Sequence, residues 1–310
     1  MTDQPLLRIG TRGSPLAMAQ TLEARDKLAA ANADLAHPGA IEVMEIKTTG
    51  DAILDRPLAE VGGKGLFTKE LDAAILDGRV DIAVHSIKDV ETFLPDGVEL
   101  AACLEREDPR DAFLSLKAPS LAELPAGSVI GSASLRRQAQ ILARRPDLEV
   151  TLLRGNVQTR LGKLADGVVD ATLLAYAGLR RLGLADKASA VLEPEEMLPA
   201  VGQGAIGITC RADDARVQGW LATINHVETQ IRVTAERALI AALDGSCRTP
   251  IGGLAEIDGD RLRLRGLVAR ADGSEIFETE RTGILADAAA LGDDAGRELR
   301  QRAGDDIFAP

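Results

Sequence analysis

The feature that most limits the fold of this chain is a regular alternation of short apolar runs with helix-like runs over its first two-thirds. Apolar runs typical of strands lie at residues 6–9, 41–46, 81–84, 129–131, 150–153 and 171–174. Patterns typical of helices lie between them at residues 15–31, 66–76, 135–143, 157–165 and 177–182. This βαβα order occurs twice, and it predicts an α/β protein with two units, each a mostly parallel sheet covered by helices.

The last third of the sequence has a different pattern. A long amphipathic helix is predicted at 227–243 and a final helix at 286–302. Between them, strand-like runs are separated by Asp258-Gly259 and Asp272-Gly273, dipeptides that favour tight hairpin turns. The strand-like runs lie at residues 254–256, 262–268 and 276–282. We therefore expect a separate, smaller α+β domain of about 85 residues.

Positive charge is concentrated in one stretch of an otherwise acidic chain. The net charge is −12, yet residues 131–181 hold nine Lys and Arg against four Asp and Glu. Five of the arginines lie at junctions between strand-like and helix-like runs: Arg136, Arg137, Arg154, Arg160 and Arg181. Such junctions line the clefts of α/β sheets, and guanidinium groups form bidentate hydrogen bonds with carboxylate or phosphate. The pattern predicts a small-molecule ligand with several acidic groups. The acidic total and the 2% aromatic content disfavour nucleic acid and anionic membranes as partners.

Two strand-to-helix junctions share one design. Residues 9–15 and 130–137 each read as a strand, a Gly/Ser turn and a helix start, with Ser14 and Ser134 as helix N-caps and Pro15 at the first helical position. Each turn would present backbone N–H groups, a hydroxyl and a guanidinium to an anion. Ordinary capping beside solvated arginines is the alternative, and the occurrence of both turns with Arg154 and Arg160 favours an anion site.

A third candidate site follows the strand-like run at 81–84. His85, Ser86, Lys88 and Asp89 come at its carboxyl end, where parallel sheets usually carry their chemistry. Asp89 beside cations can stabilise a cationic intermediate or exchange protons with it. A structural Lys88–Asp89 pair is the alternative. Lys64, in a glycine-rich loop, either reaches an anion or is solvated.

The three cysteines fall into two groups. Cys103 and Cys210 lie in apolar strand-like runs and are expected in the core, whereas Cys247 lies in a turn-rich loop beside Arg248. Its surroundings leave a reactive thiol and a bystander equally open. An odd cysteine count and the lack of a signal pattern predict a reducing, cytoplasmic setting. No metal-ligand spacing and no transmembrane run occur in the sequence.

Several blocks together resemble one family, the porphobilinogen deaminases (hydroxymethylbilane synthases). The resemblance extends over essentially the whole chain. Its blocks are residues 11–17, 61–67, 81–90, 105–113, 131–138, 153–157 and 198–205, and the loop around Cys247. It implies a transferase that joins four porphobilinogen molecules head to tail with loss of ammonia and releases the linear tetrapyrrole hydroxymethylbilane. It also implies a primer, a dipyrromethane cofactor held through a thioether to Cys247.

The resemblance further implies a domain arrangement. Two α/β domains would be similar to periplasmic binding proteins, and the chain would pass between them twice. A C-terminal α+β domain would carry Cys247. The expected boundaries are residues 1–104 with 204–222, then 105–203, then 223–310. A cytoplasmic monomer is expected.

Site residues follow from the resemblance position by position. Asp89 would be catalytic, stabilising the positive charge on the pyrrole nitrogen and the azafulvene formed when ammonia leaves. The cofactor-binding set is Cys247, Lys88, Ser132, Ser134, Arg136, Arg137, Arg154, Arg160 and Arg181. The substrate-binding set is Arg12, Ser14, Lys64, Ser86 and Gln203. Three arginines, Arg144, Arg145 and Arg180, match no site position and are expected in solvent. Glu60 and Glu91 depart from the usual family pattern.

Two other classes of protein share parts of this pattern. A non-enzymatic anion-binding clamp of the periplasmic-binding-protein type would use the same strand–helix turns. A transferase that uses nucleotides or phosphoribosyl groups would share the two-lobed α/β fold. The C-terminal domain with Cys247 separates these classes, because a pure clamp has no use for it.

Overall fold

The computed structural model describes residues 4–52, 65–243, 249–304 and 307–308. The chain divides into two compact units. The first comprises residues 1–53, 63–107 and 205–230, and the second comprises 54–62, 108–204 and 231–310. Each is described by itself below. The three-part division expected from the sequence stays a prediction.

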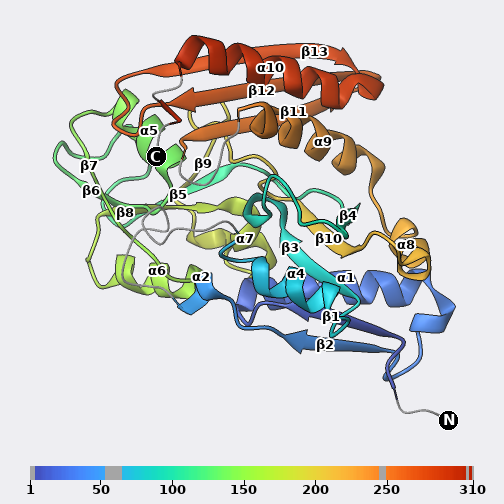
Figure 1. The fold of residues 1–310 in the computed structure, drawn as a ribbon. Helices are drawn as coiled ribbons and strands as arrows, with labels where there is room; N and C mark the ends of the chain where they lie inside the picture. The colour runs from blue at the N-terminus through green and yellow to red at the C-terminus, as the bar shows by residue number, and fades with distance from the viewer. Residues whose placement is uncertain (1–3, 53–64, 244–248, 305–306, 309–310) are drawn as a thin grey trace. The chain divides into compact units, whose positions relative to one another are not determined.

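The first unit contains a five-stranded sheet with the order β2-β1-β3-β10-β4 (Figure 1). Its strands are β1 (Leu7–Thr11), β2 (Ile41–Glu45), β3 (Ile82–Ser86), β4 (Val98–Cys103) and β10 (Ile206–Arg211). Strand β1 pairs in parallel with β2 and β3, whereas β10 runs antiparallel to both β3 and β4. The helices are α1 (Pro15–Ala31), α2 (Thr49–Ala52), α4 (Lys69–Leu76) and α8 (Ala215–Ala222).

Helices cover both faces of this sheet because its central strands are apolar on both sides. Leu28 of α1 and Leu221 of α8 pack into one buried cluster with Ile82 of β3. Leu71 of α4 packs into another cluster with Ala83, the next residue of β3. Successive residues of a strand point to opposite faces, so α4 lies on the face opposite α1 and α8.

The second unit contains a sheet of the same design, with the order β7-β6-β8-β5-β9. Its strands are β5 (Asp111–Ser115), β6 (Val129–Gly131), β7 (Glu149–Thr151), β8 (Ala171–Ala175) and β9 (Ala190–Leu192). Strand β6 is parallel to β7 and β8, and β5 is antiparallel to β8 and β9. The helices are α5 (Leu135–Arg144), α6 (Val157–Ala165) and α7 (Tyr176–Arg181). Ile141 of α5 packs on one face, and Leu164 of α6 and Leu179 of α7 pack on the other.

The prediction of mostly parallel sheets is confirmed for four of the five strands in each sheet, and one strand of each runs in the opposite direction. Each sheet is mixed, because β10 and β5 enter antiparallel between parallel strands and an edge strand. Strand β5 (Asp111–Ser115) was not expected from the sequence. Its apolar run is only three residues, 112–114, which gives little periodic signal, and pairing with β8, distant in sequence, determines its structure.

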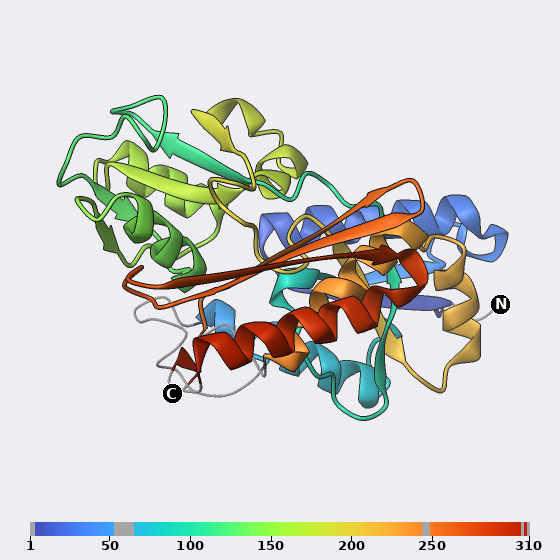
Figure 2. The same cartoon turned by 90° about the horizontal axis from the view of Figure 1, so that it is seen from above.

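The C-terminal part of the second unit is a three-stranded antiparallel sheet with two long helices. Its elements are α9 (Val227–Ala242), of which residues 227–230 are counted with the first unit, β11 (Ile251–Asp258), β12 (Arg261–Ala269), β13 (Ile276–Ile284) and α10 (Ala288–Ala303). Both hairpin turns predicted from Asp-Gly are confirmed, with positive φ at Gly259 and Gly273. Figure 2 shows α10 running along this sheet.

The two faces of this small sheet contact different elements. Leu264 of β12 packs against the helices α9 and α10. Leu267, on the opposite face of the same strand, packs with Ala139 of α5. The small sheet therefore lies between its own helices and α5.

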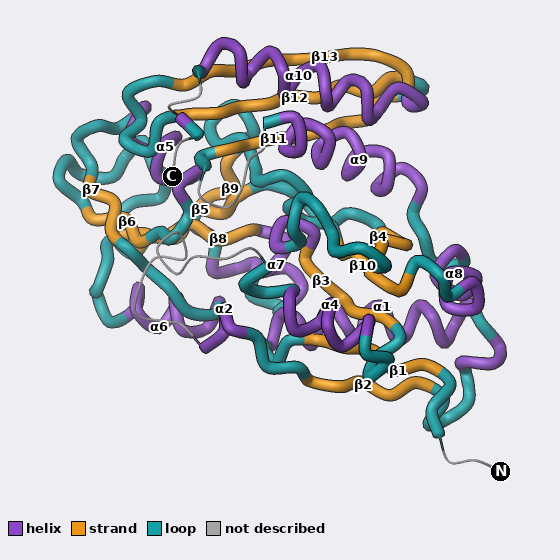
Figure 3. The backbone as a smooth tube through the Cα atoms, viewed as in Figure 1, coloured by secondary structure: helices purple, strands orange, loops and turns teal. Residues whose placement is uncertain are grey.

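Short one-turn helices complete the described secondary structure, which Figure 3 distinguishes from the loops. They are η1 (Ala33–Leu35), η2 (Ile87–Asp89), η3 (Ala185–Lys187) and η4 (Leu285–Asp287). None of the helices described is long and apolar enough to cross a lipid bilayer. The predicted fold class, two α/β sheets with helices plus a small C-terminal strand-and-helix part, is confirmed.

Candidate active site

In the first unit, Arg12 lies in the turn between β1 and α1. The side chain of Ser14 accepts a hydrogen bond from the backbone N–H of Ala17 at 3.2 Å, and Pro15 opens the helix. The predicted N-cap is thus confirmed as a structural feature. It fixes the turn that carries Arg12 at the carboxyl end of β1, at the same sheet edge as the end of β3.

Arg12 is held from three sides. Its Nε and Nη2 donate to the Asp51 carboxylate at 3.0 and 2.5 Å, and its guanidinium carbon lies 4.2 Å from the centre of the Phe67 ring. Its Nη1 lies 3.6 Å from an oxygen of Asp89. Burial alone would lower the pKa of Arg12, but hydrogen bonding to Asp51 and the charges of both carboxylates raise it. The site therefore keeps a permanent cation.

Asp51 was not recognised from the sequence. Burial tends to raise the pKa of its carboxyl, but hydrogen bonds from Arg12 and Thr48 lower it below its usual value. A signal existed, because Asp51 follows the end of β2, which is parallel to β1. The rule that pointed to Asp89 applies there too.

Asp89 ends η2, directly after β3. Its side chain is 33% exposed, so it is open to a ligand while Arg12 stands beside it. Ser86 exchanges hydrogen bonds with Gln20 of α1 at 2.9 and 3.1 Å. These side chains line one pocket, together with Phe67 and Ser14. Lys88, the middle residue of η2, is half-buried.

His85 borders the same pocket but is buried. Its Nε2 lies 2.9 Å from the hydroxyl oxygen of Thr209. Burial, with a smaller effect of the Arg12 charge, lowers the pKa of His85 to about 4. The imidazole is therefore neutral at pH 7 and adds no positive charge to the pocket.

Two residues expected at the sites, Lys64 and Cys247, lie outside the described residues, as does Glu60. Glu91, the other departure from the family pattern, accepts a hydrogen bond from the backbone N–H of Gly65. Cys103 and Cys210 are buried, as predicted. Burial, together with nearby Glu99, raises the pKa of the Cys210 thiol to about 12, so this thiol is unreactive at neutral pH.

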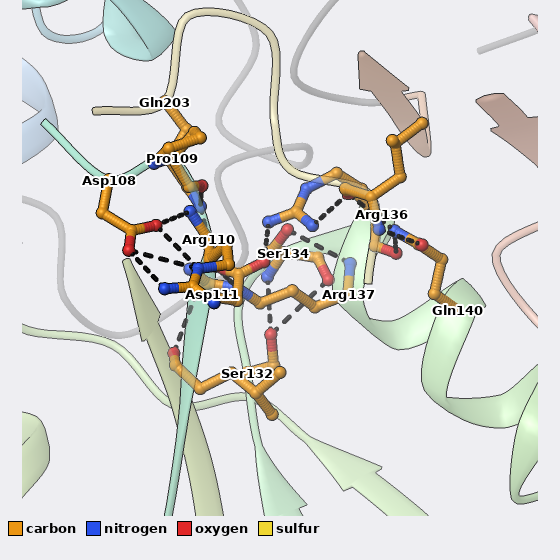
Figure 4. Close-up of polar contacts among 12 residues, drawn as sticks. Asp108, Pro109, Arg110, Asp111, Ser132, Ser134, Arg136, Arg137, Gln140 and Gln203 are labelled. Atoms are coloured by element: carbon orange, nitrogen blue, oxygen red, sulfur yellow. Dashed lines mark hydrogen bonds and ion pairs between the residues drawn. The ribbon is translucent and has the colours of Figure 1, made fainter. Parts of the chain in front are cut away.

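In the second unit, Arg136 and Arg137 share one carboxylate, that of Asp111 (Figure 4). Arg136 Nη2 donates to Asp111 Oδ2 at 2.8 Å, and Arg137 Nη2 donates to Asp111 Oδ1 at 2.7 Å. One further nitrogen of each guanidinium donates to a main-chain carbonyl: Arg136 Nη1 to that of Leu198 at 2.7 Å, and Arg137 Nη1 to that of Leu173 at 2.9 Å. Both arginine residues are 5% exposed and Asp111 is fully buried.

This cluster carries one surplus positive charge, since two guanidiniums face one carboxylate. Burial alone would raise the pKa of Asp111, but the charges of Arg136 and Arg137 and their hydrogen bonds hold it well below its ordinary value. Burial lowers the pKa of Arg136, and Asp111 counters this. Arginine nevertheless stays protonated at neutral pH. A buried site with a surplus cation favours an anionic ligand nearby.

Gln203 belongs to the same cluster. It is fully buried, and its Nε2 donates to the Pro109 carbonyl at 2.7 Å and to Asp111 at 3.0 Å. Its described contacts support Asp111, and its role toward substrate stays a prediction. Ser134 caps α5 by accepting from the Arg137 N–H at 3.4 Å, and Ser132 Oγ accepts from the Ser134 N–H at 3.1 Å.

The other predicted arginines occupy the same edge of this sheet. Arg154 follows β7 and is buried; Arg160 lies in α6, where its Nε donates to the Gly155 carbonyl at 2.8 Å; and Arg181 ends α7. Arg181 Nη2 donates to the Gly204 carbonyl at 3.1 Å. Strands β6, β7 and β8 are parallel, so the segments after them emerge together, beside the start of antiparallel β5 with Asp111.

The expectation that Arg145 lies in solvent was wrong. Its guanidinium donates to Asp147 at 2.8 and 2.6 Å and to the carbonyls of Leu121, Ala122 and Leu124. It thereby fastens the loop before β6 to the end of α5, a long-range role that a pair of adjacent arginines does not reveal. Arg144 and Arg180 are exposed, as expected.

Comparison with known proteins identifies the family. Residues 7–219 match the family model described as "Porphobilinogen deaminase, dipyromethane cofactor binding domain", and residues 230–301 match "Porphobilinogen deaminase, C-terminal domain". The chain is 58% identical over 309 residues to the chloroplastic porphobilinogen deaminase of Oryza sativa subsp. japonica, covering 98% of this chain and 86% of that protein. It is 58% identical over 303 residues to the porphobilinogen deaminase of Nitrobacter hamburgensis, covering 98% and 95%.

A solved periplasmic substrate-binding protein of an ABC transporter from Coxiella burnetii is similar at 13% identity, with a TM-score of 0.44, over 72% of this chain and 94% of that one. A likeness at this level carries no conclusion about function. The two family models and the relatives that match nearly the full chain identify the family: this chain belongs to the porphobilinogen deaminase family.

Proposed function

We propose that this chain performs the reaction of its family. It would be a transferase that joins four porphobilinogen molecules head to tail, releases ammonia at each addition and yields hydroxymethylbilane. The observation that carries the proposal is the match of residues 7–219 to the cofactor-binding domain, because this range contains every charged group of the two clusters described above. Cys247 lies outside it, between α9 and β11 in the sequence.

Asp89 and Arg12 suit the step in which ammonia leaves. The exposed Asp89 carboxylate would stabilise positive charge on the pyrrole nitrogen of the substrate, as electrostatic catalysis requires. Asp51 holds Arg12 through Nε and Nη2, so the Nη1 edge faces Asp89. A substrate carboxylate bound at this edge would bring its ring to Asp89, with Ser86 and Gln20 on the pocket wall.

The arginine cluster of the second unit suits the dipyrromethane cofactor. A fully buried Asp111 that leaves one guanidinium charge uncompensated fits a group with several carboxylates. We assign its binding to Lys88, Ser132, Ser134, Arg136, Arg137, Arg154, Arg160 and Arg181, with the thioether at Cys247. When bound, the cofactor supplies the pyrrole ring to which the first substrate is joined.

The alternatives explain less. An anion-binding clamp accounts for the two capped turns but not for a cysteine-bearing C-terminal domain. A transferase that uses nucleotides or phosphoribosyl groups would require a phosphate loop, and the glycines at 202–207 lead into strand β10 rather than a helix. We also propose that the protein acts as a cytoplasmic monomer. Light scattering and cell fractionation would test these two points.

The mass of the intact purified protein tests the proposal. We expect the wild type to carry an increment of two pyrrole units, and Cys247→Ser to lack it because the thioether sulfur is gone. Cys210→Ala is the matched control and should keep the increment, since Cys210 is buried in the first unit. An unmodified wild-type chain that still makes tetrapyrrole would contradict the assignment.

The Asp89→Ala variant tests catalysis separately from attachment of the cofactor. Turnover should fall by on the order of 10²–10⁴, the usual contribution of such a group. Thermal unfolding should stay close to the wild type, since Asp89 is partly exposed. Asp77→Asn, on an exposed residue, is the control. Near-normal turnover in Asp89→Ala would remove Asp89 from the mechanism.

A further inference from the structure

The turn between β12 and β13 lies directly on the backbone of helix α5. A Cβ built on Gly273 would lie 2.5 Å from the Ala143 nitrogen, 2.8 Å from the Ala139 oxygen and 2.9 Å from the Leu142 carbonyl carbon. Real Cβ atoms essentially never approach other heavy atoms this closely, and these are atoms of a helix backbone. Ala139 and Ala143 are four residues apart, so the glycine covers one hydrogen-bonded turn of α5. Figure 3 shows this turn at the end of the sheet beside α5.

Other contacts fix the same pair of elements. Gln138 Nε2 of α5 donates to the Ala271 carbonyl of the turn at 3.1 Å. Ala139, fully buried, packs with Leu254, Leu267 and Ala269 of the small sheet. One backbone contact, one hydrogen bond and one apolar cluster therefore hold α5 against this sheet.

The same helix presents the arginine pair. Arg136 and Arg137 lie in its first turn, next to Gln138. The Leu198 carbonyl that Arg136 contacts also accepts from Gln140 Nε2 at 3.0 Å. The next residue, Pro199, accepts from the Gly253 N–H of β11 at 2.9 Å. The small sheet thus reaches the arginine pair by two routes, through α5 and through residues 198–199.

We propose that the β12–β13 turn at Gly273 is a positioning element for the arginine pair. Docked on α5, it sets the helix against the sheet whose first strand, β11, begins shortly after Cys247 in the sequence. The inference rests on the proposed function, in which those arginines hold a cofactor attached at Cys247. Positioning of this kind matters for rate, because a misplacement of about 1 Å can cost roughly a hundredfold.

Gly273→Ala tests the proposal, and Gly259→Ala is its matched control. Both glycines are hairpin turns of one sheet with positive φ, +74° and +59°, so both variants carry left-handed strain. A Cβ at Gly259 meets nothing within 4 Å, whereas at Gly273 it meets α5. The difference between the variants isolates the docking contact. Gln138→Ala is a second variant that removes one hydrogen bond without a clash.

Three measurements on the purified holoenzyme are needed: hydrogen exchange of α5, the fraction of molecules with the covalent increment, and kcat with KM. We expect Gly273→Ala to speed exchange in α5, reduce the modified fraction and lower kcat by about tenfold to a hundredfold. KM should change little, because the Arg12 pocket belongs to the other unit. Gln138→Ala should shift in the same direction by less, and Gly259→Ala should match the wild type.

Two outcomes would overturn the proposal. In one, Gly273→Ala and Gln138→Ala behave as Gly259→Ala does in all three measurements. In the other, α5 exchanges faster while the modified fraction and kcat stay normal, which would make the contact purely structural. A wild-type protein without the increment would instead count against the proposed function, so the two failures are distinguishable.

Discussion

At the residue scale, the single carboxylate of Asp111 neutralises part of the charge of two buried arginines and fixes their positions. It accepts from both Arg136 and Arg137 inside the protein, and Gln203 supports it from a third side. Removing a single member of a buried charge group is costly, because the remaining charges stay buried without compensation. Asp111 therefore affects both the stability of the second unit and the charge of the candidate cofactor site.

Asp111→Asn should lower the free energy of unfolding by about 3–5 kcal/mol at pH 7, the usual cost of breaking a buried pair. Urea unfolding would measure this. Asp147→Asn is the control, since the Asp147 carboxylate that pairs with Arg145 is exposed, and its change should be much smaller. Equal effects of the two substitutions would show that the Asp111 cluster contributes no more than a surface pair.

The difference in unfolding free energy between the wild type and Asp111→Asn should depend on pH. The pKa of Asp111 in the folded protein is lowered by the arginines despite its burial, so its stabilisation is fully present above the unfolded value of about 3.9. It is lost as the pH falls below that value toward the folded pKa. The gap in unfolding free energy between wild type and Asp111→Asn should therefore be smaller at pH 3 than at pH 7.

At the scale of elements, two helix starts combine an observed cap with a proposed anion contact. Ser14 and Ser134 cap α1 and α5, and both lie next to arginines of the candidate sites. Capping and anion binding are separable, because Asp and Asn both cap as well as Ser but only Asp adds negative charge.

Ser14→Asp should leave thermal unfolding near the wild type yet raise KM by roughly tenfold or more, since like charges across an interface cost several kcal/mol. Ser14→Asn, the neutral cap, should keep KM close to the wild type. Steady-state kinetics of the pair would measure this. If Asp and Asn behave alike, Ser14 serves the helix alone.

The local elements could be predicted from the sequence, whereas the long-range contacts could not. The N-caps, the Asp-Gly hairpins and the candidate residues at strand ends follow from neighbours in sequence, so periodicity and turn chemistry sufficed for them. Asp111 and Asp51 gain their importance from residues 25 and 39 positions away. The burial of Arg136 and the loop contacts of Arg145 likewise depend on tertiary packing, which carries no local pattern.

At the scale of the whole chain, one buried acid joins distant segments of the second unit. Glu236 of α9 is fully buried, and its two oxygens accept from the Gly202 N–H at 2.6 Å and from the Ala255 N–H of β11 at 2.8 Å. Gly202 precedes Gln203, which supports Asp111. Helix α9, the small sheet and the arginine cluster are connected through this residue.

Glu236→Gln should lower the free energy of unfolding by about 1–3 kcal/mol, because an amide has one oxygen and leaves a buried N–H without an acceptor. Urea unfolding would measure it. Glu228→Gln, an exposed position on the same helix, should change stability little. A neutral result for Glu236→Gln would mean that the two backbone donors find other acceptors.

The position of strand β10 in the sheet limits how early the first unit can complete its folding during synthesis. Residues 206–211 lie between β3 and β4, strands that leave the ribosome more than a hundred residues earlier. Until β10 emerges, the facing edges of β3 and β4 have no strand between them, and open edges invite aggregation. The N-terminal unit therefore cannot complete its folding before the arginine-bearing sheet has been made. The facing edges of β3 and β4 therefore stay open until about two-thirds of the chain has been made.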